Sequence, residues 1–359
     1  MRILIDIGHP AHVHLFKHFA WQMQKNGHEI FFTVRDKEHE LYLLSAYGFK
    51  YRSFGRHLKS KIGKIIGLLR FNIKMLDTAL SFKPDIFLSH GSIYAAQIAW
   101  FLRKPHISLE DTGNMEQVLL YRPFSKAILT PITLEKKLGS KQIQLRTYHE
   151  LAYLNPVYFK KSPDVLKLLN IKQGENYCII RLVSWNATHD AGKAGLNEIE
   201  LMEIVNFLSS KMKVFISSEQ NLPPDLLKYK LMLSPDIMHD VLAFSSLVIS
   251  EGATLAAEAG FLGVPTIYVN PQQTCNIKEL EDIGCVFSFK NGQRVLVKAK
   301  EVINNMTLKD FVVINSANLL HDKIDLTLFM IWFVENYPQS FNIMKENPEY
   351  QDNFKTATT

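Results

Sequence analysis

Short apolar runs alternate with longer amphipathic segments along most of the chain. The short runs have the length and composition of buried strands, and the longer segments have the apolar spacing of helices. Strands and helices in alternation predict parallel sheets with helices on both faces, an α/β fold. The predicted strands are 2–7, 29–34, 49–54, 85–89, 106–109, 127–130, 177–182, 214–217 and 247–249.

The predicted strands fall into two series of similar size. Each series begins with a strand and an open loop, as doubly wound domains do. A chain of 359 residues is also longer than one ordinary domain. We therefore predict two Rossmann-like domains facing a central cleft, at 1–162 and 163–337, followed by a polar tail at 338–359.

The stretch LVISEGATLAAEAGFLGVPTIYV at 247–269 predicts a strand, a tight turn, a short helix and a second strand. Thr254 is placed to cap the helix, and Gly263 and Pro265 close it. A helix that starts in such a turn directs unpaired N–H groups and its positive end at a ligand, which suits phosphate. The residues expected at that phosphate are Ser250, Gly252, Ala253 and Thr254.

Glu258 lies four residues after Thr254, so its carboxylate is on the same helix face. There it would bind two adjacent hydroxyls, such as those of a ribose. A phosphate site beside a diol site suggests a nucleotide. The alternative is an ordinary βαβ unit in which glycine and proline only end the elements.

Histidines and carboxylates follow the first, fourth and fifth predicted strands. Doubly wound domains bind their ligands at the carboxyl ends of the strands, so these residues are candidates for catalysis or acceptor binding. For the two carboxylates the alternative is a plain helix N-cap. The candidates are His9, His12, His14, His90, Gly91, Glu110 and Asp111.

The segment 56–82 combines apolar residues at helical spacing with basic residues between Arg56 and Lys74. One interpretation is an amphipathic helix that lies on an anionic membrane, which would suit a lipid-linked substrate. The other is a helix whose apolar face packs on the core while its basic face is solvated.

The net charge of +6 and the pI near 9.0 favour anionic partners, among which we expect nucleotides and not nucleic acid. Cys178, Cys275 and Cys285 have no C-x-x-C spacing and indicate neither a disulfide framework nor a zinc ribbon. The chain shows no signal peptide and no apolar run that could span a bilayer. We expect a cytoplasmic protein, either soluble or bound at the inner face of the plasma membrane.

Four stretches carry a family resemblance: MRILIDIGHPAHVHLFKHF, YHELAYLNP, RLVSWNATHD and SEGATLAAEAGFLGVP. Together they resemble the DUF354 family, which is grouped with the GT-B glycosyltransferases, such as the MurG type, and with the UDP-GlcNAc 2-epimerases. The resemblance implies a GT-B fold in which the apolar run LTLFMIWFV crosses back onto the first domain. It also implies transfer of a sugar from a UDP-sugar to a glycan or lipid-linked acceptor in cell-surface polysaccharide synthesis.

Such a transfer needs a base for the acceptor hydroxyl and positive charge for the leaving diphosphate. We expect His12 to be the base, with His9 as a second candidate, and Asp111 to be a further catalytic residue. The chain contains no Asp-x-Asp, so we expect catalysis without a metal and without a resident cofactor. The loop residues expected at the diphosphate are Arg181, Ser184 and His189.

Three other interpretations compete with the transferase. An epimerase would use the same fold, with His9, His12, Glu110 and Asp111 as acids and bases. A metallohydrolase would bind zinc through the two histidines of the H-V-H run at 12–14, together with His90 and Asp111. The third is a protein that binds a sugar nucleotide without catalysis.

Overall fold

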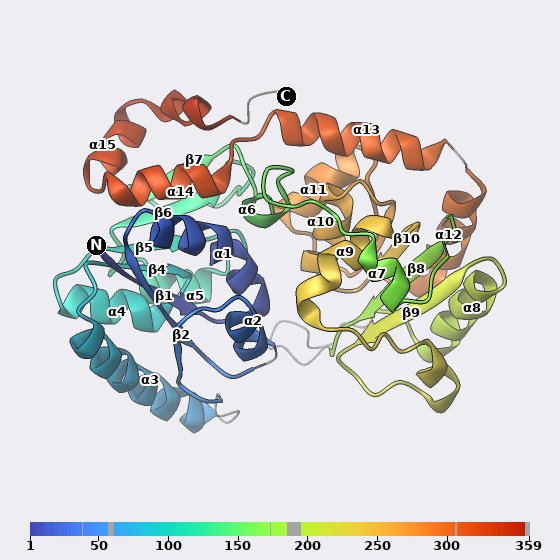
Figure 1. Ribbon diagram of the computed structural model, residues 1–359, viewed down its shortest axis with the longest axis horizontal. Helices are drawn as coiled ribbons and strands as arrows, with labels where there is room; N and C mark the ends of the chain where they lie inside the picture. The colour runs from blue at the N-terminus through green and yellow to red at the C-terminus, as the bar shows by residue number, and fades with distance from the viewer. Residues whose placement is uncertain (38, 57–60, 173, 185–194, 306, 356–359) are drawn as a thin grey trace. The chain divides into compact units, whose positions relative to one another are not determined.

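The computed structural model describes residues 1–37, 39–56, 61–172, 174–184, 195–305 and 307–355, with the backbone alone for 61–66. The chain forms two compact units (Figure 1), and each is described by itself. The first unit comprises Met1–Tyr158 and Asp322–Thr359, and the second comprises Phe159–His321.

The first unit is built on a seven-stranded parallel sheet with the order β3-β2-β1-β4-β5-β6-β7. Ile3, Leu4 and Ile5 of the inner strand β1 are fully buried, because helices cover both faces of the sheet. The carboxyl ends of β1, β4 and β5 are neighbours along one edge of the sheet. The strands are β1 (Arg2–Ile7), β2 (Glu29–Val34), β3 (Tyr51–Ser53), β4 (Ile86–His90), β5 (His106–Leu109), β6 (Ala127–Pro131) and β7 (Gln142–Leu145).

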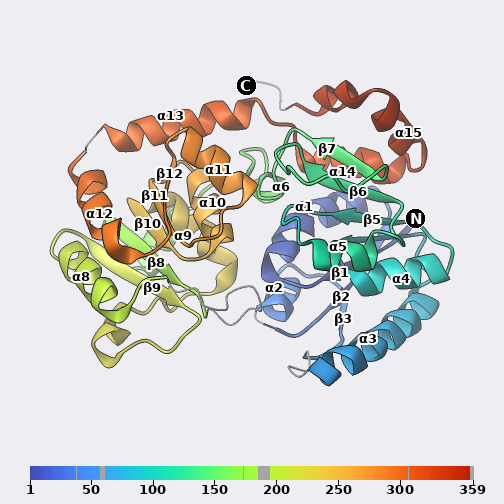
Figure 2. The same cartoon turned by 180° about the vertical axis from the view of Figure 1, so that it is seen from behind.

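The helices of the first unit cover the two faces of its sheet (Figures 1 and 2). Helix α1 packs with α6 and α14 on one face, and α3 packs with α4 on the other. Leu4, Phe71 and Ile98 share the apolar core beneath α3 and α4. The helices are α1 (Pro10–Lys25), α2 (Glu40–Ala46), α3 (Lys61–Phe82), α4 (Ile93–Phe101), α5 (Met115–Tyr121), α6 (Leu151–Leu154), α14 (Leu326–Glu335), α15 (Gln339–Glu346) and the 3-10 helix η5 (Pro348–Phe354).

The second unit is built on a five-stranded parallel sheet with the order β12-β11-β10-β8-β9. Alternate residues of β8 enter two separate cores: Ile180 packs with Ile249 on one face, and Ile179 packs with Val248 on the other. Its strands are β8 (Tyr177–Leu182), β9 (Lys213–Ser218), β10 (Leu247–Ser250), β11 (Thr266–Val269) and β12 (Val286–Phe289). Its α-helices are α7 (Asp164–Leu168), α8 (Glu198–Ser209), α9 (Met238–Phe244), α10 (Ala253–Phe261), α11 (Cys275–Asp282), α12 (Val295–Asn304) and α13 (Leu308–His321).

The predicted α/β fold is confirmed. The nine strands predicted with bounds are all present, with ends shifted by no more than two residues, and β11 is the predicted second strand of the 247–269 stretch. Strands β7 and β12 were not predicted; both lie at sheet edges, and Gln142–Leu145 alternates polar and apolar residues instead of forming a continuous apolar run. No helix in the described part of the chain is long and apolar enough to cross a membrane.

The apolar run LTLFMIWFV forms α14 and crosses back onto the first unit, as predicted; the return begins at Asp322. The predicted polar tail was wrong. The segment 338–355 is folded as α15 and η5. It folds because Tyr350 and Phe354 stack on Trp332 of α14, which lies among the buried aromatic side chains of the first unit.

Candidate functional site

The candidate catalytic residues meet at the carboxyl edge of the first sheet. His12 lies in the first turn of α1, just after β1. His90 is the last residue of β4, and Asp111 follows β5 by two residues. Because β1, β4 and β5 are adjacent parallel strands, the residues after them lie close together.

Asp111 lies between two imidazole rings. His90 Nε2 donates to Asp111 Oδ1 at 2.9 Å, and His149 Nδ1 lies 3.0 Å from Asp111 Oδ2. His149 comes from the segment between β7 and α6, and its ring is edge-on to that of His90 at a centroid distance of 5.1 Å. The structure thus adds His149, which was not among the predicted site residues, to the predicted pair His90 and Asp111.

His90 and Asp111 each stabilise the charged form of the other. Burial lowers the pKa of His90, but the charge of Asp111 and its hydrogen bond outweigh burial and raise that pKa to about 9. Burial raises the pKa of Asp111, but the charges of His149 and His90 hold it well below its usual range. At neutral pH the pair is therefore an imidazolium and a carboxylate.

His12 lies against this charged group as a neutral ring. Its imidazole stacks on that of His90 with centroids 4.4 Å apart. Burial and the positive charge of His90 lower the pKa of His12 well below its ordinary value. The Gly8 N–H donates to Nδ1 of His12 at 3.3 Å, so the neutral ring carries its proton on Nε2.

The other two histidines after β1 have different partners. His9 is the N-cap of α1, and its Nδ1 accepts the N–H of Ala11 at 3.2 Å. His14 is buried between the rings of Tyr47 and Tyr153, which places it away from the His12 and His90 rings. His14 is therefore a packing residue of α1. The predicted zinc site that joins His12 and His14 was wrong, because side chains two residues apart on a helix do not face each other.

Glu110 was predicted to face an acceptor, and the structure instead gives it a role within its own loop. Its Oε1 accepts the N–H groups of Thr112 and Gly113 and the hydroxyl of Thr112, at 2.7–2.9 Å. Its Oε2 accepts the hydroxyl of Tyr121 at 2.8 Å. Glu110 is 2% exposed, so it shapes the loop that carries Asp111.

Buried hydroxyls fix the turn that follows β4. Ser108 Oγ accepts the N–H of Gly91 at 3.0 Å, and Ser89 Oγ accepts the N–H of Ser92 at 3.0 Å. Gly91 has a φ of +61°, a conformation that favours glycine. Gly91 is thus a structural residue of the turn that positions His90.

A buried ion pair beneath Gly8 was not predicted. Arg35 Nη1 lies 2.5 Å from Oδ2 of Asp6, whose Oδ1 accepts the hydroxyl of Thr33 at 2.7 Å. A Cβ added at Gly8 would lie 2.6 Å from Arg35 Nη2. The sequence signal was an aspartate inside an apolar strand, which requires a buried partner. Gly8 is needed because the guanidinium occupies the space that a side chain would fill.

The same edge of the sheet contains a group that could hold a metal ion. One ligand atom each from His90, Asp111 and His149 lie within 4.8 Å of one another. Two imidazoles and a carboxylate are typical ligands of zinc and of other transition metals. In the structure the same atoms are used for the contacts between Asp111 and the two rings.

In the second unit the predicted phosphate turn lies between β10 and α10. Helix α10 begins at Ala253 with Gly252 as its N-cap, so Thr254 lies inside the first turn and the predicted Thr254 cap was wrong. Ser250 Oγ accepts the N–H of Gly252 at 3.1 Å and fixes the turn. No side chain accepts a capping hydrogen bond at Gly252, so first-turn N–H groups of α10 are available to an anion.

Glu251, inside this turn, accepts hydrogen bonds from two backbone N–H groups elsewhere in the second unit. Its Oε2 accepts the N–H of Val183 at 2.9 Å, and its Oε1 accepts the N–H of Leu196 at 2.8 Å. Its carbonyl accepts the side-chain amide of Asn270 at 2.9 Å. The buried carboxylate therefore joins Val183 and Leu196 to the phosphate turn.

Three more predicted donor residues, Arg181, Ser184 and Glu258, have protein partners. Arg181 donates to Ser217 Oγ at 2.8 Å and pairs with Glu219 Oε1 at 2.5 Å. The N–H of Ser184 donates to Glu219 Oε2 at 3.2 Å. Glu258 is buried, with Oε1 3.2 Å from Nε2 of His239. His189 lies outside the described residues.

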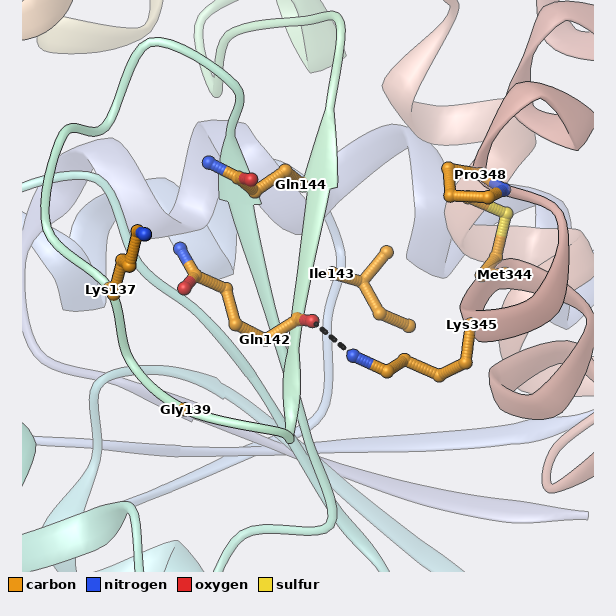
Figure 3. Close-up of a pocket in the computed structure, with 8 residues that line it drawn as sticks. All are labelled: Lys137, Gly139, Gln142, Ile143, Gln144, Met344, Lys345 and Pro348. Atoms are coloured by element: carbon orange, nitrogen blue, oxygen red, sulfur yellow. Dashed lines mark hydrogen bonds between the residues drawn. The ribbon is translucent and has the colours of Figure 1, made fainter.

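A cavity of about 410 Å³ lies elsewhere in the first unit, between β7 and the helical segment 339–354 (Figure 3). Lys345 Nζ donates to the Gln142 carbonyl at 3.4 Å inside it. Gln142 begins β7, whereas the candidate site lies where the strands end. The cavity is therefore separate from the histidine group.

A model of the family described as "Protein of unknown function (DUF354)" matches residues 1–331. The chain belongs to the DUF354 family. The chain is also similar to the uncharacterized protein MJ0665 of Methanocaldococcus jannaschii, with 24% identity over 287 residues, 77% of this chain and 83% of that protein.

Solved structures place this DUF354 chain in the GT-B fold. The S. aureus MnaA–UDP co-structure superposes with a TM-score of 0.70 at 12% identity, over 94% of this chain and 97% of that one. The Neisseria meningitidis UDP-GlcNAc 2-epimerase bound to UDP-GlcNAc has a TM-score of 0.65 at 15% identity and covers 89% of this chain and 98% of that one. The Streptomyces sp. SF2575 glycosyltransferase SsfS6 has a TM-score of 0.61 at 13% identity and covers 94% of this chain and 100% of that one. The predicted GT-B fold is confirmed.

Proposed function

We propose that this DUF354 protein is a GT-B glycosyltransferase that transfers a sugar from a UDP-sugar to a glycan or lipid-linked acceptor. The proposal is supported by the fold, by the phosphate turn before α10, and by similar structures whose titles name UDP or UDP-GlcNAc. The acceptor class follows from the family resemblance, as does a role in cell-surface polysaccharide synthesis.

One observation carries the catalytic assignment: Asp111 lies between His90 and His149, with the neutral His12 stacked on His90. In the transfer, the acceptor oxygen bonds to the anomeric carbon of the sugar, the bond from that carbon to the diphosphate breaks, and the acceptor proton passes to a base. His12 is the base because burial and the positive charge of His90 lower its pKa and keep it unprotonated. His9 Nδ1 is already used to cap α1, which makes His9 the second choice.

His12 must change tautomer before Nε2 can accept a proton. In the structure the Gly8 N–H donates to Nδ1, which leaves the proton on Nε2. A hydrogen bond of 3.3 Å is weak, so its loss costs about 1 kcal/mol or less. The imidazolium that forms after proton transfer is stabilised by Asp111, whose charge raises the pKa of His12.

The donor would be held in the second unit. First-turn N–H groups of α10, at Ala253 and Thr254, would bind the diphosphate with Ser250 and Gly252 beside them. Arg181, Ser184 and His189 would add contacts, and Arg181 would then share its charge with Glu219. Glu258 would bind the ribose with His239 as its supporting partner. No metal is assigned a role in this scheme.

A non-hydrolysing epimerase is the second candidate. Two observations favour it: the TM-score of the Neisseria UDP-GlcNAc 2-epimerase, 0.65 against 0.61 for the glycosyltransferase SsfS6, and a site that combines a neutral imidazole, an imidazolium and a carboxylate. Epimerisation needs an acid and a base in one site, and these groups could supply both.

Proton NMR of the protein incubated with UDP-sugars in D₂O distinguishes these functions. A transferase releases UDP only when an acceptor, such as a polyprenyl phosphate or an oligosaccharide, is added. An epimerase inverts the sugar and incorporates deuterium without an acceptor. Equal rates with and without EDTA would support metal independence. The absence of turnover across UDP-sugars and acceptors would overturn both assignments.

A further inference from the structure

Helix α3 has a second apolar face that points away from the core. Phe71, Met75 and Ala79 are buried beneath it. Leu69, Ile73 and Leu80 are 66%, 60% and 57% exposed, and their spacing places them on one face of the helix. The core-packing interpretation of this helix was therefore wrong for Leu69, Ile73 and Leu80.

The apolar surface continues onto the neighbouring helices. Helix α4 contacts both α3 and α5 (Figure 2). Trp100 and Phe101, at the end of α4, are 58% and 62% exposed. A groove of about 360 Å³ between α3 and α4 is lined by Ile73, Trp100 and Phe101 together with Phe124. We call the following residues the α3–α5 apolar surface: Leu69, Ile73, Leu80, Trp100, Phe101, Leu119 and Leu120.

Basic residues border this surface. Arg103 and Lys104 follow α4, and Arg122 and Lys126 follow α5. Lys141 adds a cation beside Arg122, because its Nζ donates to the carbonyls of Arg122 and Pro123 at 3.0 and 2.9 Å. The nearby acids are Asp77, paired with Arg52, Asp85, paired with Lys104, and the exposed Glu116.

We propose that the α3–α5 apolar surface binds an anionic phospholipid bilayer. Exposed leucine, isoleucine, tryptophan and phenylalanine side chains bordered by arginine and lysine are suited to the boundary between headgroups and acyl chains. The leucines, Trp100 and Phe101 enter that boundary while Arg103, Arg122 and Lys126 contact the headgroups. An exposed apolar groove of about 360 Å³ flanked by further exposed apolar side chains is typical of an interaction site.

The charge pattern favours a bilayer over a second copy of the chain. In a twofold dimer the same surface faces itself, so the basic border of one copy would oppose the basic border of the other. Like charges in that position disfavour association, whereas anionic headgroups neutralise them. The proposal does not depend on sugar transfer.

Flotation with lipid vesicles tests the proposal. We expect the protein to float with vesicles of phosphatidylglycerol and phosphatidylcholine at low salt, and much less with phosphatidylcholine alone. Trp100→Ser with Phe101→Ser should weaken binding roughly tenfold or more, from the lost apolar burial. Arg103→Gln with Lys126→Gln should weaken it about fivefold per charge. Binding should fall as salt rises.

Exposed residues of the second unit provide matched controls. Ile199→Ser with Met232→Ser removes side chains that are 73% and 76% exposed, and Lys211→Gln with Lys309→Gln removes two exposed charges. Both control pairs should bind vesicles as the wild type does, and circular dichroism checks that every variant is folded. Equal flotation with neutral vesicles, no flotation, or equal losses in the control pairs would overturn the proposal. So would a dimer in sedimentation equilibrium that Trp100→Ser with Phe101→Ser converts to monomer.

Discussion

The imidazole of His12 stacks on that of His90, with ring centroids 4.4 Å apart and an interplanar angle of 26°. Asp111 holds His90 in its charged form, and burial together with the charge of His90 holds His12 in its neutral form. The protonation of His12 is thus coupled through His90 to Asp111. The chemistry proposed for the first unit depends on this coupling.

Asp111→Asn should remove the coupling. His90 would lose the charge that raises its pKa, and the pair with His149 would be lost. We expect kcat/KM to fall by about 10²–10⁴, as when an acid–base group is disabled. The control is Glu116→Gln, an exposed carboxylate on α5 that should leave kcat/KM unchanged. An Asp111→Asn enzyme with wild-type kcat/KM would contradict the assignment.

The stability of the first unit should depend on pH through His90. Its folded pKa of about 9 is above the ordinary value of 6.5, so its stabilising contribution is complete below pH 6.5 and is lost as pH rises through 9. The difference in unfolding free energy between wild type and His90→Gln should shrink by roughly 3 kcal/mol over that range. Urea unfolding at several pH values measures it. A difference that stays constant from pH 6 to pH 10 would show that Asp111 does not hold His90 charged.

Gly8→Ala should destabilise the first unit. The new Cβ would lie 2.6 Å from Arg35 Nη2 and would displace the guanidinium from the buried Asp6. We expect a loss of about 1–3 kcal/mol. Gly67→Ala is the control, since a Cβ at Gly67 meets no atom of the described side chains within 4 Å, and alanine is the better helix residue by about 0.5–1 kcal/mol. Thermal unfolding of the two variants should therefore shift in opposite directions.

Glu251→Ala should destabilise the second unit. It leaves the N–H groups of Val183 and Leu196 without their carboxylate acceptor, at about 1–3 kcal/mol for each buried donor. Glu251→Gln keeps one acceptor oxygen and should lose less. Glu203→Gln, an exposed carboxylate on α8, is the control. The same urea midpoint for Glu251→Ala and wild type would show that these two hydrogen bonds do not stabilise the second unit.

The sequence predicted the structure best where the pattern of apolar residues matches the residues that are buried. Strands such as β1 and β8 are continuous apolar runs, so their bounds could be predicted to the residue. Topology then predicts that residues after adjacent strands meet, which is why His12, His90 and Asp111 were found together. Glu110 and Asp111 are neighbours in a polar turn, and only the loop geometry shows that Glu110 faces inward to Tyr121.

Other features depend on contacts that the sequence does not encode locally. His149 lies 59 residues after His90 and beyond the unpredicted strand β7. Its stretch YHELAYLNP carries part of the family resemblance, but no pattern in it indicated that His149 would meet Asp111. Helix α3 has apolar residues on two faces, and periodicity alone cannot say which face meets the core. Thr254 and Gly252 are both acceptable N-caps, and the structure uses Gly252.

Calorimetric titration of UDP in the presence of EDTA tests the central claim, a uridine-nucleotide site at the start of α10. We predict that wild type binds UDP, that Asp111→Asn binds it with about the same affinity because it lies in the other unit, and that Glu258→Ala binds it at least roughly tenfold more weakly. Glu258→Gln and circular dichroism check that the loss is not due to unfolding around His239. Absence of UDP binding by wild type, or wild-type affinity in a folded Glu258→Ala, would contradict the account.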